Sequence, residues 1–186
     1  MQGDLLGGAG EIHRLFLALW PDAPVRRAVR AAVERLQREH APGGRAVNPA
    51  RYHVTLQYFG DFDRRPDALL ADVRRALAAL GMPRFVLPLE RAGRFGTVGW
   101  LGPERTPEPL DALWRALDAA LRGAGVRTRG HARFVPHLTV LRDMRRPLPP
   151  VALAPIEWPV DRVVLIDSRH GGGGPAYDLL ESWPLR

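Results

Sequence analysis

Two short segments of the chain carry the same pattern of a histidine, an apolar residue, a threonine and a second apolar residue. They are His53-Val54-Thr55-Leu56 and His137-Leu138-Thr139-Val140. Histidine is the side chain best able to give or take a proton near neutral pH, and a threonine hydroxyl can donate a hydrogen bond to an anionic oxygen. The two copies together therefore predict a site in which one imidazole acts as an acid and the other as a base.

The spacing within each motif suits a β-strand. Residues two apart on a strand point to the same face, so each histidine shares a face with its threonine. The apolar residues Val54, Leu56, Leu138 and Val140 then belong to the opposite face and are expected in the core. Both motifs would thus present their polar side chains from rigid elements.

Such a pair of imidazoles fits the opening of a cyclic phosphodiester. The reaction needs a base to activate water and an acid to protonate the departing ribose oxygen, on opposite sides of the phosphorus. The threonine hydroxyls can donate hydrogen bonds to the non-bridging oxygens as charge develops there. No metal ion is required, and the chain has neither cysteine nor the clustered histidine and carboxylate ligands that a metal phosphodiesterase would need.

Apolar periodicity, with glycine and proline as breaks, predicts the elements that carry these motifs. We expect strands over 14–20, 52–59, 85–90, 97–101, 134–141, 162–168 and 176–183, and helices over 22–40, 66–80 and 106–123. Asp22 and Thr106 stand where the caps of the first and last helix belong. The run Gly171 to Gly174 lacks the lysine and helix of a phosphate-binding loop and is expected to be a hairpin turn.

Each half of the chain contains a helix, a break and a strand with His-x-Thr, so an internal duplication of architecture is predicted. The expected fold is α+β, with two pseudo-symmetric lobes whose antiparallel sheets face a central cleft and whose helices lie outside. At 186 residues, one domain is the simplest organisation. We expect a flexible N-terminal arm over 1–12 and a single bilobal domain over 13–186.

Composition narrows the class of protein. The net charge of +7 would attract phosphate-bearing partners, but every basic residue is arginine, so a compositional bias explains the excess equally well. Without cysteine there is no disulfide, thiolate nucleophile or cysteine zinc site. No stretch is long and apolar enough to span a membrane, so the sequence predicts a cytoplasmic location, with no membrane contact and no obligate protein partner.

Taken together, the motifs resemble the 2H phosphoesterase superfamily, and within it the RNA 2′,3′-cyclic phosphodiesterases, also called 2′-5′ RNA ligases. The resemblance runs from RLFLALWPD at Arg14 through both motifs to SRHGGGGPAYDLLESWPL. It implies hydrolysis of RNA 2′,3′-cyclic phosphate ends to 2′-phosphomonoesters without a metal or cofactor, and possible reversal to 2′-5′ ligation. By motif order it implies His53 as acid and His137 as base, with Thr55 and Thr139 on the phosphate, although the acid and base labels are interchangeable from sequence.

Two flanking residues also match the family pattern. Arg142 resembles an arginine that contacts substrate after the second motif, and Tyr58 resembles an aromatic residue that stacks on a base. Both lie an odd number of residues from their histidine, so an ideal strand would turn them away from the cleft. A β-bulge or a strand end is therefore expected near each.

Other functions stay open at this point. The same chemistry could serve small cyclic nucleotides, ADP-ribose cyclic phosphate or 2′-5′ oligonucleotides, and a non-catalytic RNA-binding module could keep the fold. The remaining histidines and most of the five tryptophans are expected to have structural roles.

Overall fold

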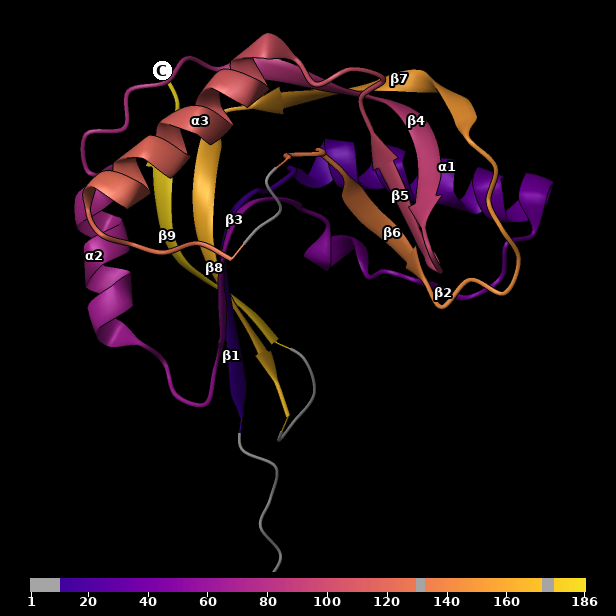
Figure 1. Cartoon of the computed structure of the whole chain (residues 1–186). Helices are drawn as coiled ribbons and strands as arrows, with labels where there is room; N and C mark the ends of the chain where they lie inside the picture. Colours follow the sequence, from indigo (N-terminus) through magenta and orange to yellow (C-terminus); the bar gives the residue numbers. More distant parts are fainter. Residues whose placement is uncertain (1–10, 130–132, 172–175) are drawn as a thin grey trace, which may run out of the picture.

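The computed structural model describes residues 11–129, 133–171 and 176–186, and its elements alternate between strands and helices (Figure 1). In chain order they are β1 (Ile12–Leu19), α1 (Ala23–His40), β2 (Arg45–Ala46), a 3₁₀ turn (Pro49–Arg51), β3 (Val54–Phe62), α2 (Asp67–Leu77), β4 (Phe85–Phe95), β5 (Val98–Gly102), α3 (Glu108–Gly123), β6 (Leu138–Arg142), β7 (Val151–Val160), β8 (Arg162–His170) and β9 (Ala176–Pro184). Residues 1–10 of the expected arm and most of the Gly171 to Gly174 run lie outside the described residues.

The strands form an antiparallel sheet in the order β7-β4-β5-β6-β3-β1-β8-β9, with β2 paired to β6. This confirms the α+β class and the antiparallel pairing. The two expected sheets are continuous, however, because the residue pair Val54 and Leu138 joins β3 to β6. In Figure 1 the sheet curls into an arch, with β3, β1, β8 and β9 in one limb and β4, β5, β6 and β7 in the other. We call these the first and second lobes.

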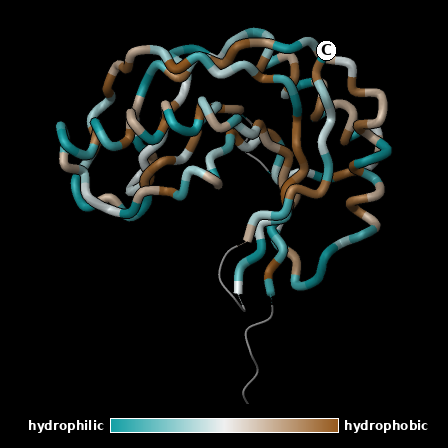
Figure 2. Tube along the Cα trace, turned by 180° about the vertical axis from the view of Figure 1, so that it is seen from behind, coloured by the Kyte–Doolittle hydropathy of each residue, from teal (hydrophilic) through white to brown (hydrophobic). Residues whose placement is uncertain are grey.

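Side chains of the first lobe alternate between the two faces of the sheet. On β1, Leu15, Leu17 and Leu19 enter the main core with the helices, whereas Phe16 and Ala18 join a smaller cluster on the other face. The view from behind in Figure 2 shows apolar residues recurring along the strands of the arch. This period of two leaves one face for the helices and one for the cleft.

The helices cover the outer faces, as expected. Helix α1 packs against β7 in the second lobe, although β1 before it and β3 after it belong to the first, and α3 packs against α2 and β3 (Figure 1). Four residues at helical spacing bury the inner side of α1, namely Val25, Val29, Val33 and Leu36. The side chain of Asp22 accepts a hydrogen bond from the Val25 amide at 3.0 Å, which confirms the predicted cap.

Several predicted boundaries were wrong. Helix α3 begins at Glu108 with Pro107 at the cap position and no side-chain bond, so Thr106 is not its cap. Helix α2 ends at Leu77, three residues before the expected Leu80. Strand β6 begins at Leu138 and not at Phe134 as expected, because the segment before it contains a proline and does not pair with β5.

Strand β7 was missed because prolines interrupt its sequence. Pro155 and Pro159 have no amide hydrogen to donate, whereas a central strand forms hydrogen bonds with a neighbouring strand on each side. The structure places β7 at an edge of the sheet, where one side of the strand needs no partner. In the part of the chain that the structure describes, none of the helices combines the length and apolar character needed to cross a bilayer.

Candidate active site

The two histidines lie in equivalent positions, each directly before its strand. His53 precedes β3 and His137 precedes β6, and the residues that follow them, Val54 and Leu138, form the pair that joins the lobes. Around this antiparallel pair, the register brings Thr55 of the first motif toward His137 of the second. Both of these side chains line one cavity. The structure therefore brings the motifs together, although they are far apart in the sequence.

Each imidazole makes the same bond to the backbone. His53 Nδ1 is 2.7 Å from the carbonyl oxygen of Arg51, and His137 Nδ1 is 2.8 Å from that of Val135, in both cases two residues earlier in the chain. A carbonyl oxygen can only accept, so Nδ1 must carry the hydrogen in both rings. Nε2 is then the atom that can exchange a proton, and the bond fixes the orientation of each ring.

The apolar residues of the motifs occupy the core as predicted. Val54, Leu56, Leu138 and Val140 are all buried. The cavity that His137 lines measures about 940 Å³, and its wall includes the aromatic residues Tyr58, Phe95, Trp114 and Phe134 together with two arginines, Arg129 and Arg133. Such a wall offers flat surfaces to a nucleobase.

A β-bulge brings Tyr58 to the same face as Thr55. Along β1, Ala18 pairs with Thr55 and its neighbour Leu17 pairs with Gln57, so Leu56 is the extra residue on β3. The indole of Trp114 donates a hydrogen bond to the Leu56 carbonyl at 2.9 Å, which supports the bulge from α3. The bulge that the odd spacing of Tyr58 required is therefore present.

The hydroxyl of Tyr58 is held away from the motif by an ion pair. It donates to Asp61 Oδ1 at 2.7 Å, and the same carboxylate receives two bonds of 2.8 Å from Arg14. The Arg14 guanidinium lowers the pKa of Asp61 to about 2. The hydroxyl is thus engaged, and the ring of Tyr58 faces the cavity.

His53 lies among three aromatic rings. It stacks on Phe16 with 4.9 Å between ring centroids and on Trp20 with 6.2 Å, and Tyr177 lies 6.0 Å away. Burial lowers the pKa of His53 to about 4, against the opposing effect of the Arg51 carbonyl bond, and the charges of His137 and Arg142 lower it further. His53 is therefore neutral at pH 7.

His137 has a different neighbour. The edge of Phe95 meets its ring with 5.1 Å between centroids, and Phe95 in turn stacks on Trp100 at 5.3 Å. Trp100 lies directly over Gly93, where an added Cβ would come within 2.5 Å of the indole. Glycine at this position is what lets the Trp100 ring lie flat on β4 beneath Phe95.

The structure places the last two predicted residues less closely. Arg142 is the final residue of β6, before Asp143 turns the chain with a φ of 55°, so the expected strand end is present. Its charge reaches the cleft, since it lowers the pKa values of His53 and His170. Thr139 is half-buried and pairs with Trp100 across the sheet, outside the wall of the cavity.

Sequence reasoning missed most of the aromatic residues around the histidines. Trp20, Trp100 and Trp114 were assigned to the core with the other tryptophans, yet all three are only half-buried, and Trp158 alone of the five is fully buried. Trp114 follows Leu113 at the border of the apolar side of α3, which was an available signal. Within the described residues, no three metal-ligating side chains cluster together.

The chain matches known proteins over most of its length. Residues 21–172 match the model of the 2′-5′ RNA ligase superfamily. A relative from Thermus thermophilus named RNA 2′,3′-cyclic phosphodiesterase is 31% identical, over 93% of this chain and 90% of its own. One with the same name from Methanothermobacter thermautotrophicus is 33% identical, over 69% of this chain and 70% of its own.

Solved structures agree with this assignment. The protein TT0787 of Thermus thermophilus is 30% identical with a TM-score of 0.75, over 93% of this chain and 98% of its own. E. coli LigT in complex with 3′-AMP is 25% identical with a TM-score of 0.75, over 95% of this chain and 99% of its own. The family match, the curated relatives and the shared fold establish that this chain belongs to the 2′-5′ RNA ligase superfamily.

Proposed function

We propose that this protein hydrolyses the 2′,3′-cyclic phosphate ends of RNA to 2′-phosphomonoesters, with His53 and His137 as its acid and base. One observation carries the proposal: two imidazoles, each held through Nδ1 by a backbone carbonyl, stand beside the residue pair that joins the lobes. We infer that the two Nε2 atoms, one from each lobe, exchange protons at one phosphate. The names of the relatives support an RNA substrate.

The electrostatics favour His53 as the base. Because its pKa lies near 4, its Nε2 is unprotonated at neutral pH and can accept a proton from water. The water oxygen then bonds to phosphorus as the bond between phosphorus and the ribose 3′ oxygen breaks. His137 supplies the proton that the departing 3′ oxygen takes. This exchanges the labels that motif order implied.

The remaining residues serve the phosphate and the base. We infer that Thr55, and Thr139 by the symmetry of the motifs, donate hydrogen bonds to the non-bridging oxygens. Arg142 adds a positive charge close to His53, which favours an anionic substrate there. Tyr58 lines the cavity together with Phe95 and Trp114, which suits stacking of the terminal nucleobase.

The test is hydrolysis of a short oligoribonucleotide that ends in a 2′,3′-cyclic phosphate, followed by mapping of the terminal phosphate. We expect a 2′-phosphate, which resists an enzyme specific for 3′-phosphates. Quantitative formation of a 3′-phosphate would contradict the proposed orientation of the ring. Binding without turnover would instead favour a non-catalytic RNA-binding module.

The same assay distinguishes RNA ends from smaller substrates. Faster turnover of a free cyclic nucleotide, of ADP-ribose cyclic phosphate or of a 2′-5′ linkage than of the oligoribonucleotide would assign the site to that smaller substrate. Addition of an RNA with a free 5′-hydroxyl tests 2′-5′ ligation, because that hydroxyl can attack phosphorus in place of water while the bond to the ribose 3′ oxygen breaks.

A further inference from the structure

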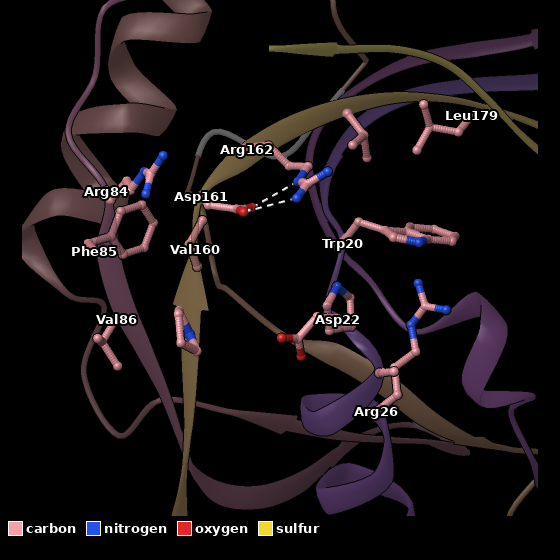
Figure 3. A pocket seen from close by; sticks show the side chains of 14 residues that line it. Trp20, Asp22, Arg26, Arg84, Phe85, Val86, Val160, Asp161, Arg162 and Leu179 are labelled. Carbon is pink, nitrogen blue, oxygen red and sulfur yellow. Dashed lines mark hydrogen bonds and ion pairs between the residues drawn. The ribbon is translucent and has the colours of Figure 1, made fainter. Parts of the chain in front are cut away.

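A second cavity is lined by Trp20 and shares none of its lining residues with the aromatic cavity. It measures about 690 Å³, within the range of about 300–1,000 Å³ typical of small-molecule sites. In Figure 3 Arg84 and Phe85 form one wall, Trp20 and Arg26 the opposite wall, and Asp161 and Arg162 lie between them. The start of β4, the turn between β7 and β8, and the first turn of α1 therefore meet here.

Trp20 connects this cavity to the site of the reaction. Its ring lines the cavity and also stacks on His53, with 6.2 Å between the ring centroids. Val164 lines the cavity too, and it belongs to the same apolar cluster as Phe16, which stacks on His53. Trp20 and Val164 thus place this cavity next to the surroundings of His53, whereas His137 lines the aromatic cavity.

The charged residues that line the cavity are three arginines and two aspartates, so its net charge is positive. Both oxygens of Asp161 accept bonds from Arg162, at 2.8 and 2.9 Å, so these two residues neutralise each other. Asp22 is occupied by its cap bond to the Val25 amide. Arg84 donates its Nε to the Leu185 carbonyl at 3.1 Å, which anchors the root of the guanidinium group.

Arg26 has a buried hydrogen-bond donor without an acceptor among the described residues. Its guanidinium lies over the Trp20 ring at 5.1 Å, and its Nε is buried without a hydrogen-bond partner among the described residues. A buried donor without a partner is uncommon and indicates a group that a ligand or water completes. The cavity therefore combines an anion-binding arginine pair with the aromatic surfaces of Trp20 and Phe85.

We propose that this cavity, defined by Trp20, Arg26, Arg84 and Phe85, binds the nucleotide that precedes the cyclic end in an oligoribonucleotide. Arg26 and Arg84 contact the phosphate that links this nucleotide to the terminal one, and the rings of Trp20 and Phe85 contact its base. The inference rests on the proposed function and deepens it. The phosphate that joins the two nucleotides and the base of the preceding one then occupy this cavity, and the terminal base occupies the aromatic cavity that His137 lines. The site thus selects RNA chains over free cyclic nucleotides.

The test compares a cyclic mononucleotide with a dinucleotide and a trinucleotide that end in the same cyclic phosphate. We expect kcat/KM to rise about tenfold from the mononucleotide to the dinucleotide, as gained charge-assisted hydrogen bonds allow, and to change little with the third nucleotide. Arg84→Gln removes the charge but keeps an amide donor for Leu185, and should lower the value for the dinucleotide about tenfold. The value for the mononucleotide should stay at the wild-type level.

Arg27→Ala is the matched control, because Arg27 is exposed on the same turn of α1 as Arg26 but lies outside the cavity. It removes one positive charge and should change neither substrate. Arg84→Gln and Arg26→Gln should each also weaken the dependence of kcat/KM on salt concentration for the dinucleotide, as loss of one phosphate contact predicts.

The outcomes separate the inference from the proposed function. Equal kcat/KM for mononucleotide and dinucleotide in the wild-type protein would overturn the inference and leave the proposed function intact. An equal loss for both substrates in Arg84→Gln would overturn it as well, because the arginine would then support the catalytic site. Absence of turnover with every cyclic phosphate would defeat the proposed function itself, and this inference with it.

Discussion

The two His-x-Thr motifs have the same local geometry and different surroundings. Both histidines give their Nδ1 hydrogen to a carbonyl two residues back, and both stand one residue before the pair that joins the lobes. His53, however, lies on the apolar cluster of the first lobe among Phe16, Trp20 and Tyr177, and its pKa is lowered to about 4. His137 meets the edge of the half-exposed Phe95 instead.

This difference shows how a duplicated motif can support two opposite proton transfers. The local sequence orients each ring, and the side chains from distant strands set how easily the ring holds a proton. Burial among aromatic rings lowers the pKa of His53, and this favours its role as the base in the proposed reaction. In the proposed reaction, the roles of acid and base are therefore assigned by the different surroundings in the two lobes and not by a difference between the motifs.

Removal of either imidazole is the strongest way to test the comparison. General acid or base assistance contributes about 10²- to 10⁴-fold, so His53→Ala and His137→Ala should each lower kcat by about that factor. The double variant should be little worse than the worse single one, because groups that act as a unit are not additive. Single-turnover rates with a cyclic-phosphate oligonucleotide, and circular dichroism as the folding control, measure this. Near wild-type turnover of a folded His53→Ala would end the paired-histidine mechanism.

The threonines should matter less than the histidines. A hydrogen bond to a charged group contributes about 1.5–3 kcal/mol, so Thr55→Ala and Thr139→Ala should lower kcat/KM about ten- to a hundredfold. Thr55→Ser, which keeps the hydroxyl, is the matched control and should retain most of the activity. A larger effect of Thr55 than of Thr139 would extend the asymmetry of the lobes to the phosphate contacts, since Thr55 lines the cavity and Thr139 does not.

The pH dependence of kcat/KM sharpens the assignment of roles. The pKa of His53 is lowered, so this residue stays unprotonated down to about pH 4. If His53 is the base, activity falls as the pH decreases through that value. Phe16→Ala should admit water beside the ring, raise this pKa and shift the acidic limb toward neutral pH. An acidic limb that Phe16→Ala leaves at the wild-type pH would contradict the assignment of that limb to His53.

The smallest expected effect is that of metal removal. Because the proposed proton transfers use the two imidazoles alone, excess EDTA should leave kcat and KM unchanged. The assay compares initial rates of cyclic-phosphate hydrolysis before and after chelation. Loss of activity that returns with an added divalent ion would contradict a mechanism that uses only the two histidines.

Much of the fold follows from local patterns. The apolar period of two predicted β1 and the β8–β9 hairpin, and the helical period predicted α1 with its Asp22 cap. The failures have local causes as well: Pro155 and Pro159 concealed the edge strand β7, and Pro107 took the cap position expected for Thr106. The bulge at Leu56 was expected only because Tyr58 lay out of register with His53.

The sequence by itself predicted the proposed chemistry from two histidines with matched threonines, and it predicted the apolar residues that bury the opposite faces and the family of the chain. Only the tertiary structure decided how the histidines differ, because Phe16, Trp20 and Tyr177 reach His53 from β1, its C-terminal end and β9, and pairing between distant strands is not encoded in the spacing of either motif. It also decided that the residue pair Val54 and Leu138 joins the lobes. Desolvation depends on what surrounds a group in space, and that is settled only when the strands are assembled.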